Sequence, residues 1–498
     1  MYGRTPVYGR TAAHGRTPAY PGLLPSRVAA RRRRPQTVLF LFLLLPLLLT
    51  LASCTGGPGG GGPSGGVPSR AEASGEIVVA SGRDVTGKNG IRQQLIDAWN
   101  ARQGSSGWSA RLVELPGSAD EQRSQLLGAL QSGSARYDVV NLDVTWVPEF
   151  AEAGLIRPLG PEAVADPGDV IPAVAATADW RGERYSVPFN SDVGLLYYRR
   201  DYLARAGVRQ TDLSRGVGWD ELHELIDQVD ADPPPGYEAG WTTQLAGYEG
   251  RTVNAVEAFA SARPASPLTD EDGHYRAGQD DLWAGLTELW GRTVSDDILD
   301  HAFTSDEAAT LSDFADGRTA FLRHWPYAYR TLHQTFSEAQ LGVTTLPGAA
   351  VLGGQNLAVT SSSPRARKAA ELIRFLTDAD SERCLLDAGF AATRLSAYRD
   401  DRRRCTHVAE PSAPSASPSA TGEATDRMPR DKAGRPAYAV DILLPALQHA
   451  VQRPRTPLYG AFTQTFIAEL DAVFTRHTAP DEKLVRHVDE ALRRALPD

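Results

Sequence analysis

Short apolar runs alternate with amphipathic segments near the front of the chain, and this order constrains the fold more than any other feature. Residues 77–80, 111–115 and 137–142 are each predicted to form a strand. Helices are predicted between them, from residue 90 to 104 and at residues 121–131, because apolar side chains recur there on one face. Strands that alternate with helices indicate a parallel sheet covered by helices, so we expect an α/β fold.

The later sequence continues this mixture of elements. A strand is predicted at residues 195–198 and a helix at residues 219–229. Ser363-Pro364 is expected to supply the N-cap and first position of another helix, which runs to residue 376. Two helices, at residues 461–474 and 481–496, are expected to come last.

An export signal is predicted at the N-terminus. Four arginines at residues 31–34 precede an apolar run at residues 38–52, and small residues follow, as in a signal peptide. The run is too short to predict a good membrane-spanning helix. Leu51-Ala52-Ser53-Cys54 resembles the lipobox of bacterial lipoproteins, which implies cleavage before Cys54 and lipidation of that cysteine. The alternative is an ordinary signal peptide with an incidental cysteine.

We therefore expect residues 1–53 to be a leader and lipoprotein signal peptide. The rest of the chain is expected to be extracytoplasmic and held by lipid at the outer face of the cell membrane. Residues 54–75, rich in Gly, Pro and Ser, are predicted to be a flexible tether. Residues 408–436, rich in Pro, Ser, Ala and charge, are predicted to be a disordered surface insertion.

Charge and cysteine content limit the binding partners and metals that we expect for this chain. The chain has a formal net charge of −9, and residues 1–53 hold eight Arg and no Asp or Glu, which leaves −17 from Cys54 onward. Such an acidic chain is a poor candidate for binding nucleic acid. Outside the cytoplasm, Cys384 and Cys405 either form a disulfide, which we favour, or remain two free thiols. Neither arrangement is a zinc cluster, and we expect no metal and no cofactor.

The signatures of common enzymes are incomplete. Residues 82–88 fit the phosphate-loop pattern GxxxxGK, but Asn89 stands where the magnesium-binding hydroxyl belongs. No GxSxG elbow is present. Asp227 stands where His223-Glu224 would need a second histidine to form a zinc helix. Carboxylates are plentiful, so a secreted glycoside hydrolase stays open as an alternative. We expect a protein that is not an enzyme and has no catalytic residues.

Aromatic and polar planar side chains occur together near the predicted loops. The aromatic members are Trp146, Trp219, Trp241, Tyr248, Trp325, Tyr327 and Tyr459. The polar members are Asn141, Asp143, Asn190, Asp192, Gln244, Asn356 and Arg394. Sugars need this mixture, because their C–H faces pack on rings while their hydroxyls pair with carboxylates, amides and guanidinium groups. The alternative for any single tryptophan is core packing, which we expect for Trp99 and Trp283.

Six segments resemble, in the same order, the extracellular solute-binding proteins of carbohydrate ABC transporters, particularly the maltose- and trehalose-binding branch. They lie at residues 137–156, 187–198, 316–327, 353–377, 392–394 and 453–459. Together they span nearly all of residues 76–498. Gln355 departs from the pattern, since such proteins often have an aromatic residue there, and the 408–436 insertion is longer than usual.

The resemblance implies a periplasmic-binding-protein-like fold, in which two hinge-linked α/β lobes enclose a ligand cleft. Lobe 1 is expected at residues 76–188 plus 343–376, and lobe 2 at residues 189–342 plus 377–498. The implied function is a lipid-anchored, monomeric binding component of an ABC importer. It would capture a di- or oligosaccharide and deliver it to the permease subunits. The alternatives are a lipid-anchored glycoside hydrolase and a binding protein for a non-sugar solute.

The resemblance also implies which residues bind the ligand. The expected set is Asp84, Asp143, Trp146, Asn190, Asp192, Gln244, Tyr248, Trp325, Gly353, Gly354, Asn356 and Arg394. Asp143 and Asp192 match carboxylates that accept sugar hydroxyls. Trp325 matches a stacking ring and Arg394 a donor to hydroxyls, while Glu249 is a weaker candidate.

Overall fold

The computed structural model describes residues 74–84, 90–133, 136–293, 296–408, 426–474 and 479–496. The chain divides into two units, Met1–Pro68 and Ser69–Asp498, and every described residue belongs to the second unit. Cys54, the predicted signal peptide and nearly all of the predicted tether lie outside the described residues. Within the described ranges, no helix is long and apolar enough to cross a membrane.

The first sheet has five strands in the order β2, β1, β3, β11, β6. Their bounds are β1 (Glu76–Gly82), β2 (Ser109–Leu115), β3 (Val139–Asp143), β6 (Val187–Val193) and β11 (Leu352–Val359). Strand β1 is parallel to β2 and β3, as the strand–helix alternation predicts. Strand β11 runs antiparallel to β3 and β6, so the sheet joins segments that are far apart in the sequence.

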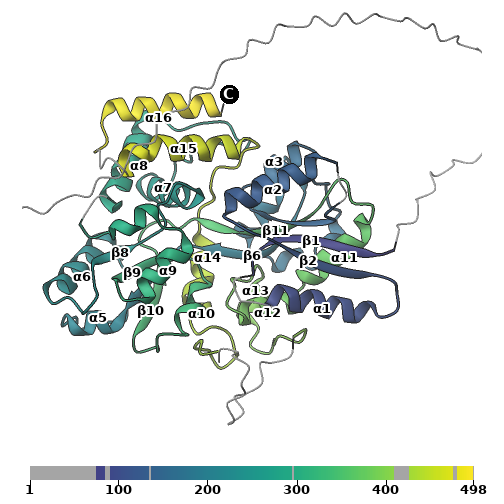
Figure 1. Cartoon of the computed structure of the whole chain (residues 1–498), viewed down its shortest axis with the longest axis horizontal. Helices are drawn as coiled ribbons and strands as arrows, with labels where there is room; N and C mark the ends of the chain where they lie inside the picture. Colours follow the sequence, from purple (N-terminus) through teal and green to yellow (C-terminus); the bar gives the residue numbers. More distant parts are fainter. Residues whose placement is uncertain are drawn as a thin grey trace, which may run out of the picture. The chain divides into compact units, whose positions relative to one another are not determined.

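Helices cover both faces of the first sheet (Figure 1). They are α1 (Ile91–Gln103), α2 (Ala119–Gln131), α3 (Val147–Glu152), α11 (Ala366–Leu376) and α12 (Ala379–Asp387). Alternate strand residues explain the two layers, because Ile77 and Val79 pack in one core with α1, α11 and α12, whereas Ala80 and Val140 pack in another with α2 and α3. We call this sheet with its helices the first lobe.

The second sheet has four strands in the order β10, β7, β9, β8. Their bounds are β7 (Leu195–Arg199), β8 (Ala239–Thr242), β9 (Thr319–His324) and β10 (Leu341–Thr345). Strand β9 is parallel to β8 and antiparallel to β7, which is also antiparallel to β10. Leu196 and Tyr198 on one face and Leu195 and Tyr197 on the other belong to separate cores.

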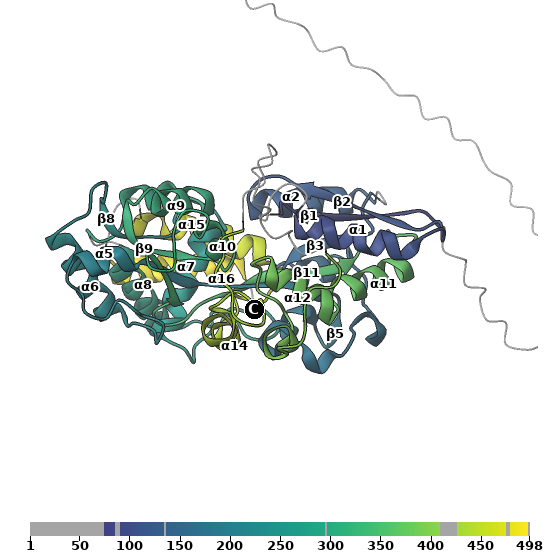
Figure 2. The same cartoon turned by 90° about the horizontal axis from the view of Figure 1, so that it is seen from below.

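The second sheet also has helices on both faces, and this sheet with its helices is the second lobe. The helices in the core with Leu196 are α6 (Trp219–Ala231), α7 (Glu249–Ala262), α8 (Gln279–Thr293), α15 (Tyr459–Phe474) and α16 (Glu482–Ala495). Those in the core with Leu195 are α9 (Glu307–Ala315), α10 (Ala328–Leu332) and α14 (Leu444–His449). Figure 2 shows α6 and α8 with the second sheet, and α1 and α11 with the first.

Shorter elements connect and flank the two lobes. They are α4 (Pro172–Ala175), β4 (Asp179–Trp180), β5 (Glu183–Arg184), α5 (Arg200–Arg205), α13 (Leu395–Arg399) and a π-helical turn at Ala439–Leu443.

The chain passes from the first sheet to the second at Gly194. This residue stands between the last residue of β6 and the first residue of β7. A Cβ atom there would lie against Glu257 Oε1, inside van der Waals contact, and 3.0 Å from Arg323 Nη2. The crossing therefore needs glycine because a buried ion pair occupies the space of a side chain.

Several segments lie in lobes other than those predicted. Residues 189–193 stay in the first sheet, because β6 pairs with β11 as far as Val193. Residues 343–345 belong to the second sheet, because β10 pairs with β7. Helix α12 packs against α1 and α11 of the first lobe, where Cys384 and Leu385 are buried in that lobe's core.

The predicted disordered insertion is wrong for its last part. Residues 409–425 lie outside the described residues, but Met428 and Ala433 are each 5% exposed. Arg435 pairs with Asp401 at 2.8 Å and donates to the backbone oxygen of Tyr398, which ties this segment to its neighbours. Apolar anchors separated by polar residues thus order a segment that composition alone assigns to disorder.

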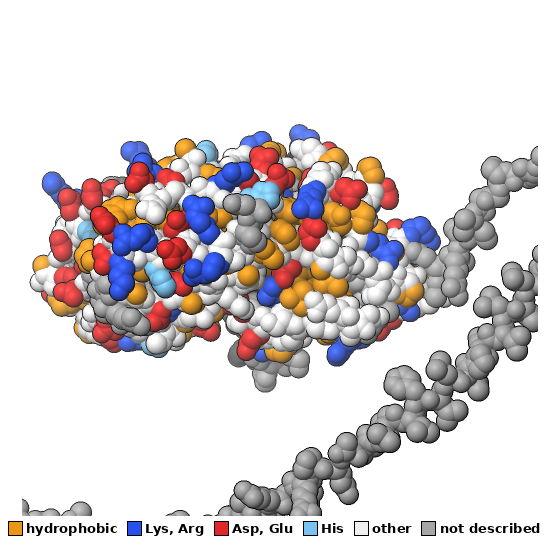
Figure 3. Space-filling model, turned by 90° about the horizontal axis from the view of Figure 1, so that it is seen from above, with side chains coloured by type: hydrophobic (Ala, Val, Ile, Leu, Met, Phe, Trp, Pro, Cys, Tyr) orange, Lys and Arg blue, Asp and Glu red, His pale blue; other side chains and the backbone are white. Residues whose placement is uncertain are grey.

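Cys384 of α12 and Cys405 form a disulfide, with Cα atoms 4.5 Å apart. The bond fixes the chain a few residues before the 409–425 segment. Figure 3 shows one face of the molecule, on which acidic and basic side chains are intermingled.

Candidate functional site

A buried arginine organises the strand ends of the first lobe. Arg92, in the first turn of α1, donates from Nη2 to Asn190 Oδ1 at 3.0 Å and to Gln355 Oε1 at 2.7 Å. Asn141 Nδ2 donates to the same Gln355 oxygen at 2.7 Å. Three strands, β3, β6 and β11, are therefore linked through one guanidinium group and one amide. We call Arg92, Asn141, Asn190 and Gln355 the amide network; Asp192 lies beside it, two residues after Asn190 on β6.

Asp192 is a carboxylate beside this network with one oxygen that lacks a hydrogen-bond partner among the described residues. Its Oδ1 atom is buried and accepts no hydrogen bond from any described residue. Burial raises the pKa of Asp192 to about 7, with Asp143 adding to the shift and Arg92, Arg323 and Arg453 opposing it. A buried acceptor without a partner carries a desolvation cost, which a ligand hydroxyl group can relieve.

Asp143 is held by an arginine from the C-terminal part of the chain. Arg453 Nη2 donates to Asp143 Oδ1 at 2.9 Å and to Oδ2 at 3.2 Å, while Nη1 pairs with Glu249 at 2.6 Å. Asp143 ends a strand of the first lobe and Glu249 begins α7 of the second. Tyr459 and Thr463 of α15 also donate to Glu249. Arg453, Asp143 and Glu249 thus connect the two lobes, and we call these three residues the clasp.

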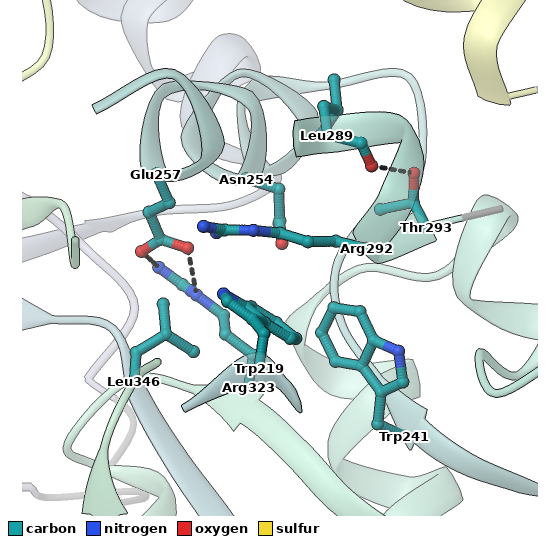
Figure 4. A pocket seen from close by; sticks show the side chains of 9 residues that line it. All are labelled: Trp219, Trp241, Asn254, Glu257, Leu289, Arg292, Thr293, Arg323 and Leu346. Carbon is teal, nitrogen blue, oxygen red and sulfur yellow. Dashed lines mark hydrogen bonds and ion pairs between the residues drawn. The ribbon is translucent and has the colours of Figure 1, made fainter. Parts of the chain in front are cut away.

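The second lobe contributes aromatic side chains. Trp325 follows β9 and Tyr248 immediately precedes α7. Arg323 lies with its guanidinium carbon 3.9 Å from the centroid of the Trp325 ring. Glu257 holds Arg323 through hydrogen bonds of 2.6 and 3.1 Å, and both side chains are almost completely buried (Figure 4). The ring therefore rests on a rigid ion pair.

Two glycines of β11, Gly353 and Gly354, lie where the two lobes approach each other beside Asp192 and Trp325. A Cβ atom on Gly353 would lie 3.1 Å from Asp192 Cβ and 3.3 Å from Trp325 Cζ3, so the first-lobe carboxylate and the second-lobe ring meet over this residue. Gly354 has a φ of +111°, a conformation that side chains rarely adopt, and a Cβ there would meet the backbone of Ser191 at 2.6 Å. Asp143, Asn190, Asp192, Trp325 and both glycines are thus brought into one region.

Four predicted residues lie elsewhere. Trp146 is 5% exposed and stacks on Phe150 in the core. Gln244 is buried behind β9, where it donates to Thr310 Oγ1 at 2.7 Å. Asn356 is 1% exposed and donates to Thr177. Successive residues of β11 face opposite sides of the sheet, so Gln355 and not Asn356 faces Arg92.

Arg394 is also used inside the fold. It donates to the carbonyl oxygens of Thr377 and Asp166 at 2.7 and 3.0 Å and is 1% exposed. It therefore braces the first lobe, and the expected role as a hydroxyl donor to ligand is not supported by its position. Asp84 is buried two residues after β1, where it accepts a hydrogen bond from the Arg92 backbone N–H at 2.8 Å. Residues 85–89, which include most of the phosphate-loop pattern, lie outside the described residues.

Sequence reasoning did not identify four important charged residues, Arg92, Glu307, Arg323 and Arg453. Arg453 lies in the segment at residues 453–459 that resembles the family, and Arg323 falls within the bounds of the segment at residues 316–327. Of the described residues that could chelate a metal, Asp270, Asp272 and His274 lie together. They form an exposed turn in which Asp270 already pairs with Arg276 at 2.8 Å.

Two cavities in the described part of the chain differ in size and lining. The cavity in Figure 4 is lined by residues that include Arg323 and Trp241 and has a volume of about 10 Å³, room for roughly one water molecule. A larger groove of about 480 Å³ is lined by residues that include Phe336 and Arg427. That groove contains no residue of the predicted ligand-binding set, so it provides a control surface.

The candidate site lies where two α/β lobes meet. Residues 94–403 match the bacterial extracellular solute-binding protein family, and the chain belongs to that family. A protein described as "Probable ABC transporter-binding protein" from Deinococcus radiodurans is 27% identical over 315 residues, which are 61% of this chain and 73% of the relative.

Solved structures share the fold. The maltose-bound MalE3 protein of T. maritima matches with a TM-score of 0.67 and 23% identity, over 85% of this chain and 100% of that one. The GacH receptor of Streptomyces glaucescens, solved without ligand and with acarbose, matches with a TM-score of 0.65 and 20% identity, over 86% and 100% of the two chains. These likenesses confirm the expected two-lobed fold of periplasmic binding proteins.

Proposed function

We propose that this protein is the solute-capturing component of an ABC importer and that its ligand is a neutral sugar, a di- or oligosaccharide. Family membership supports capture of a solute outside the cytoplasm. The matching structures bind maltose and acarbose, which supports a sugar as the ligand class. The protein releases its ligand unchanged to permease subunits, so it acts as a binding protein and not as an enzyme.

The observation that carries this proposal is the meeting of Asp192 and Trp325 over Gly353. A sugar presents apolar C–H faces and hydroxyl donors, and it is recognised by rings together with carboxylates. Asp192 supplies an acceptor with no hydrogen bond from the described residues, and Trp325 supplies a ring fixed by Arg323. The first lobe thus offers the polar half of a sugar site, and the second lobe offers the aromatic half.

We also propose that lipid on Cys54 holds a monomeric protein at the outer face of the cell membrane. The support is the sequence Leu51-Ala52-Ser53-Cys54 after an apolar run. Mass spectrometry of the protein from its native membrane tests this. A diacylated N-terminal Cys54 is expected, and a mature N-terminus at another residue would exclude it.

A thermal-shift screen tests the ligand class. A ligand that binds only the folded state raises the melting temperature, so mono-, di- and oligosaccharides can be ranked at equal concentration. Product analysis in the same samples separates capture from turnover. Stabilisation by a sugar that is recovered intact is expected. Cleaved sugar would favour the glycoside hydrolase alternative, and stabilisation by a non-sugar solute alone would remove the sugar assignment.

A further inference from the structure

Glu307 is anchored firmly at the start of a helix of the second lobe. It is the first residue of α9, and the preceding Asp306 caps that helix by accepting from Ala309 N at 2.9 Å. A carboxylate in a first helical turn is stabilised by the partial positive charge of the helix N-terminus. Phe314 buries the other end of α9 in the core. The position of Glu307 is therefore set by the fold.

Both carboxylate oxygens of Glu307 accept hydrogen bonds from aromatic side chains. Oε2 accepts from the Tyr248 hydroxyl at 2.7 Å, and Oε1 accepts from Trp325 Nε1 at 3.3 Å. The backbone oxygen of Glu307 also lies 3.1 Å from His324 Nε2. One residue thus links the start of α7 to the end of β9, the two places from which these rings project.

The Trp325 ring is consequently held on three sides. Arg323 covers one face, Glu307 holds the Nε1 edge, and Gly353 abuts the Cζ3 edge. Tyr248 is held by its 2.7 Å hydrogen bond to the same carboxylate, and burial and the nearby Glu307 charge raise the pKa of its hydroxyl well above the ordinary value. The phenol therefore remains a hydrogen-bond donor, and the direction of its bond to Glu307 does not change.

We propose that Glu307 is a positioning residue that orients Tyr248 and Trp325 for ligand binding. This inference rests on the proposed function, in which the Trp325 ring packs against the ligand, and on Tyr248 belonging to the expected ligand-binding set. An aromatic wall that is already oriented loses little conformational freedom when the ligand binds, and this raises affinity. Glu307 acts through the two rings and needs no contact of its own with the ligand.

The test uses Glu307→Gln in the full chain, with the exposed Glu338→Gln as the matched control. Glutamine keeps the shape, but its amide nitrogen cannot accept a hydrogen bond, so at least one ring loses its partner. The readout on ligand-free protein is the ¹⁵N–¹H resonance of the Trp325 indole, assigned with Trp325→Phe. We expect Glu307→Gln to move this resonance and Glu338→Gln to leave it in place. An unchanged resonance in Glu307→Gln would overturn the positioning role.

Calorimetry with maltose as the probe adds the functional readout. We expect affinity to fall about tenfold in Glu307→Gln, the effect of leaving one polar group without its partner, while Glu338→Gln binds as wild type does. Wild-type affinity in Glu307→Gln would overturn the inference. If wild-type protein bound no sugar, the sugar assignment would fail, but the indole resonance would still decide whether Glu307 positions the ring.

Discussion

Asp192 is the residue of the proposed site whose properties depend most on burial. Its Oδ1 has no partner among the described residues, and its pKa is raised to about 7 by burial. The charged groups around it are Arg92, Asp143, Arg323 and Arg453. A ligand hydroxyl that donates to the carboxylate favours the ionised form and so lowers this pKa.

Sugar affinity should therefore depend on pH through Asp192. Binding releases a proton when the free pKa lies near the working pH, so affinity should fall by up to about tenfold for each pH unit below 7. Calorimetry in two buffers of different ionisation enthalpy, from about pH 5.5 to 8, measures both the affinity and the proton release. Asp192→Asn should remove the slope. Affinity that rises as pH falls would contradict this assignment.

Arg453 should matter for stability more than any surface arginine. Replacing it by methionine leaves Asp143 and Glu249 without their shared partner, and an uncompensated buried charge costs about 3–5 kcal/mol. Urea unfolding measures the change. The control is Arg486→Met, whose exposed pair with Glu482 at 3.5 Å should contribute less than about 1 kcal/mol. Equal midpoints for the two variants would rule out a structural role for the clasp.

The sequence could not predict these roles, because the partners of each residue are remote. Arg92 meets Asn190 and Gln355, which are 98 and 263 residues away. Strand geometry decides which of the residues predicted by resemblance face the candidate site. Asp192 and Gly353 face each other across paired strands, while Asn356 turns to the opposite face of β11.

At the scale of elements, the local sequence pattern predicts some helix ends correctly and others not. Helix α1 ends at Gln103 before Gly104, whose φ of +51° suits glycine, as the sequence predicts. Helix α11 is different, because it begins at Ala366 and not beside Ser363. The Ser363 hydroxyl instead donates to Asp138 Oδ1 at 2.7 Å, a tertiary contact that the sequence does not reveal.

The crossing between the sheets should be intolerant of a side chain. Gly194→Ala places a Cβ atom against the Glu257–Arg323 pair and should destabilise the protein by about 1–3 kcal/mol, the usual effect of overpacking. Gly128→Ala in α2 is the control, since nothing lies within 4 Å of its Cβ position. That variant should gain about 0.5–1 kcal/mol from helix propensity. Thermal unfolding of both variants measures the difference, and a stable Gly194→Ala would refute the packing argument.

At the scale of the whole molecule, each lobe supplies a different half of the proposed site. The first lobe offers Asp192 and the amide network, and the second offers Trp325 and Tyr248. Family membership and the two-lobed fold account for capture. The lobe division predicted from sequence failed at residues 189–193, 343–345 and in α12, because strand pairing and helix packing there join remote segments.

Calorimetric titration of a sugar panel, with product analysis of the same samples, tests the central claim most directly. Wild-type protein should bind a sugar reversibly and return it intact. Asp192→Ala should weaken binding about ten- to a hundredfold, because a buried ligand hydroxyl loses its acceptor. Arg427→Ala, in the groove of about 480 Å³, should bind as wild type does. Loss of binding in Arg427→Ala but not in Asp192→Ala would place the ligand in that groove and contradict the account.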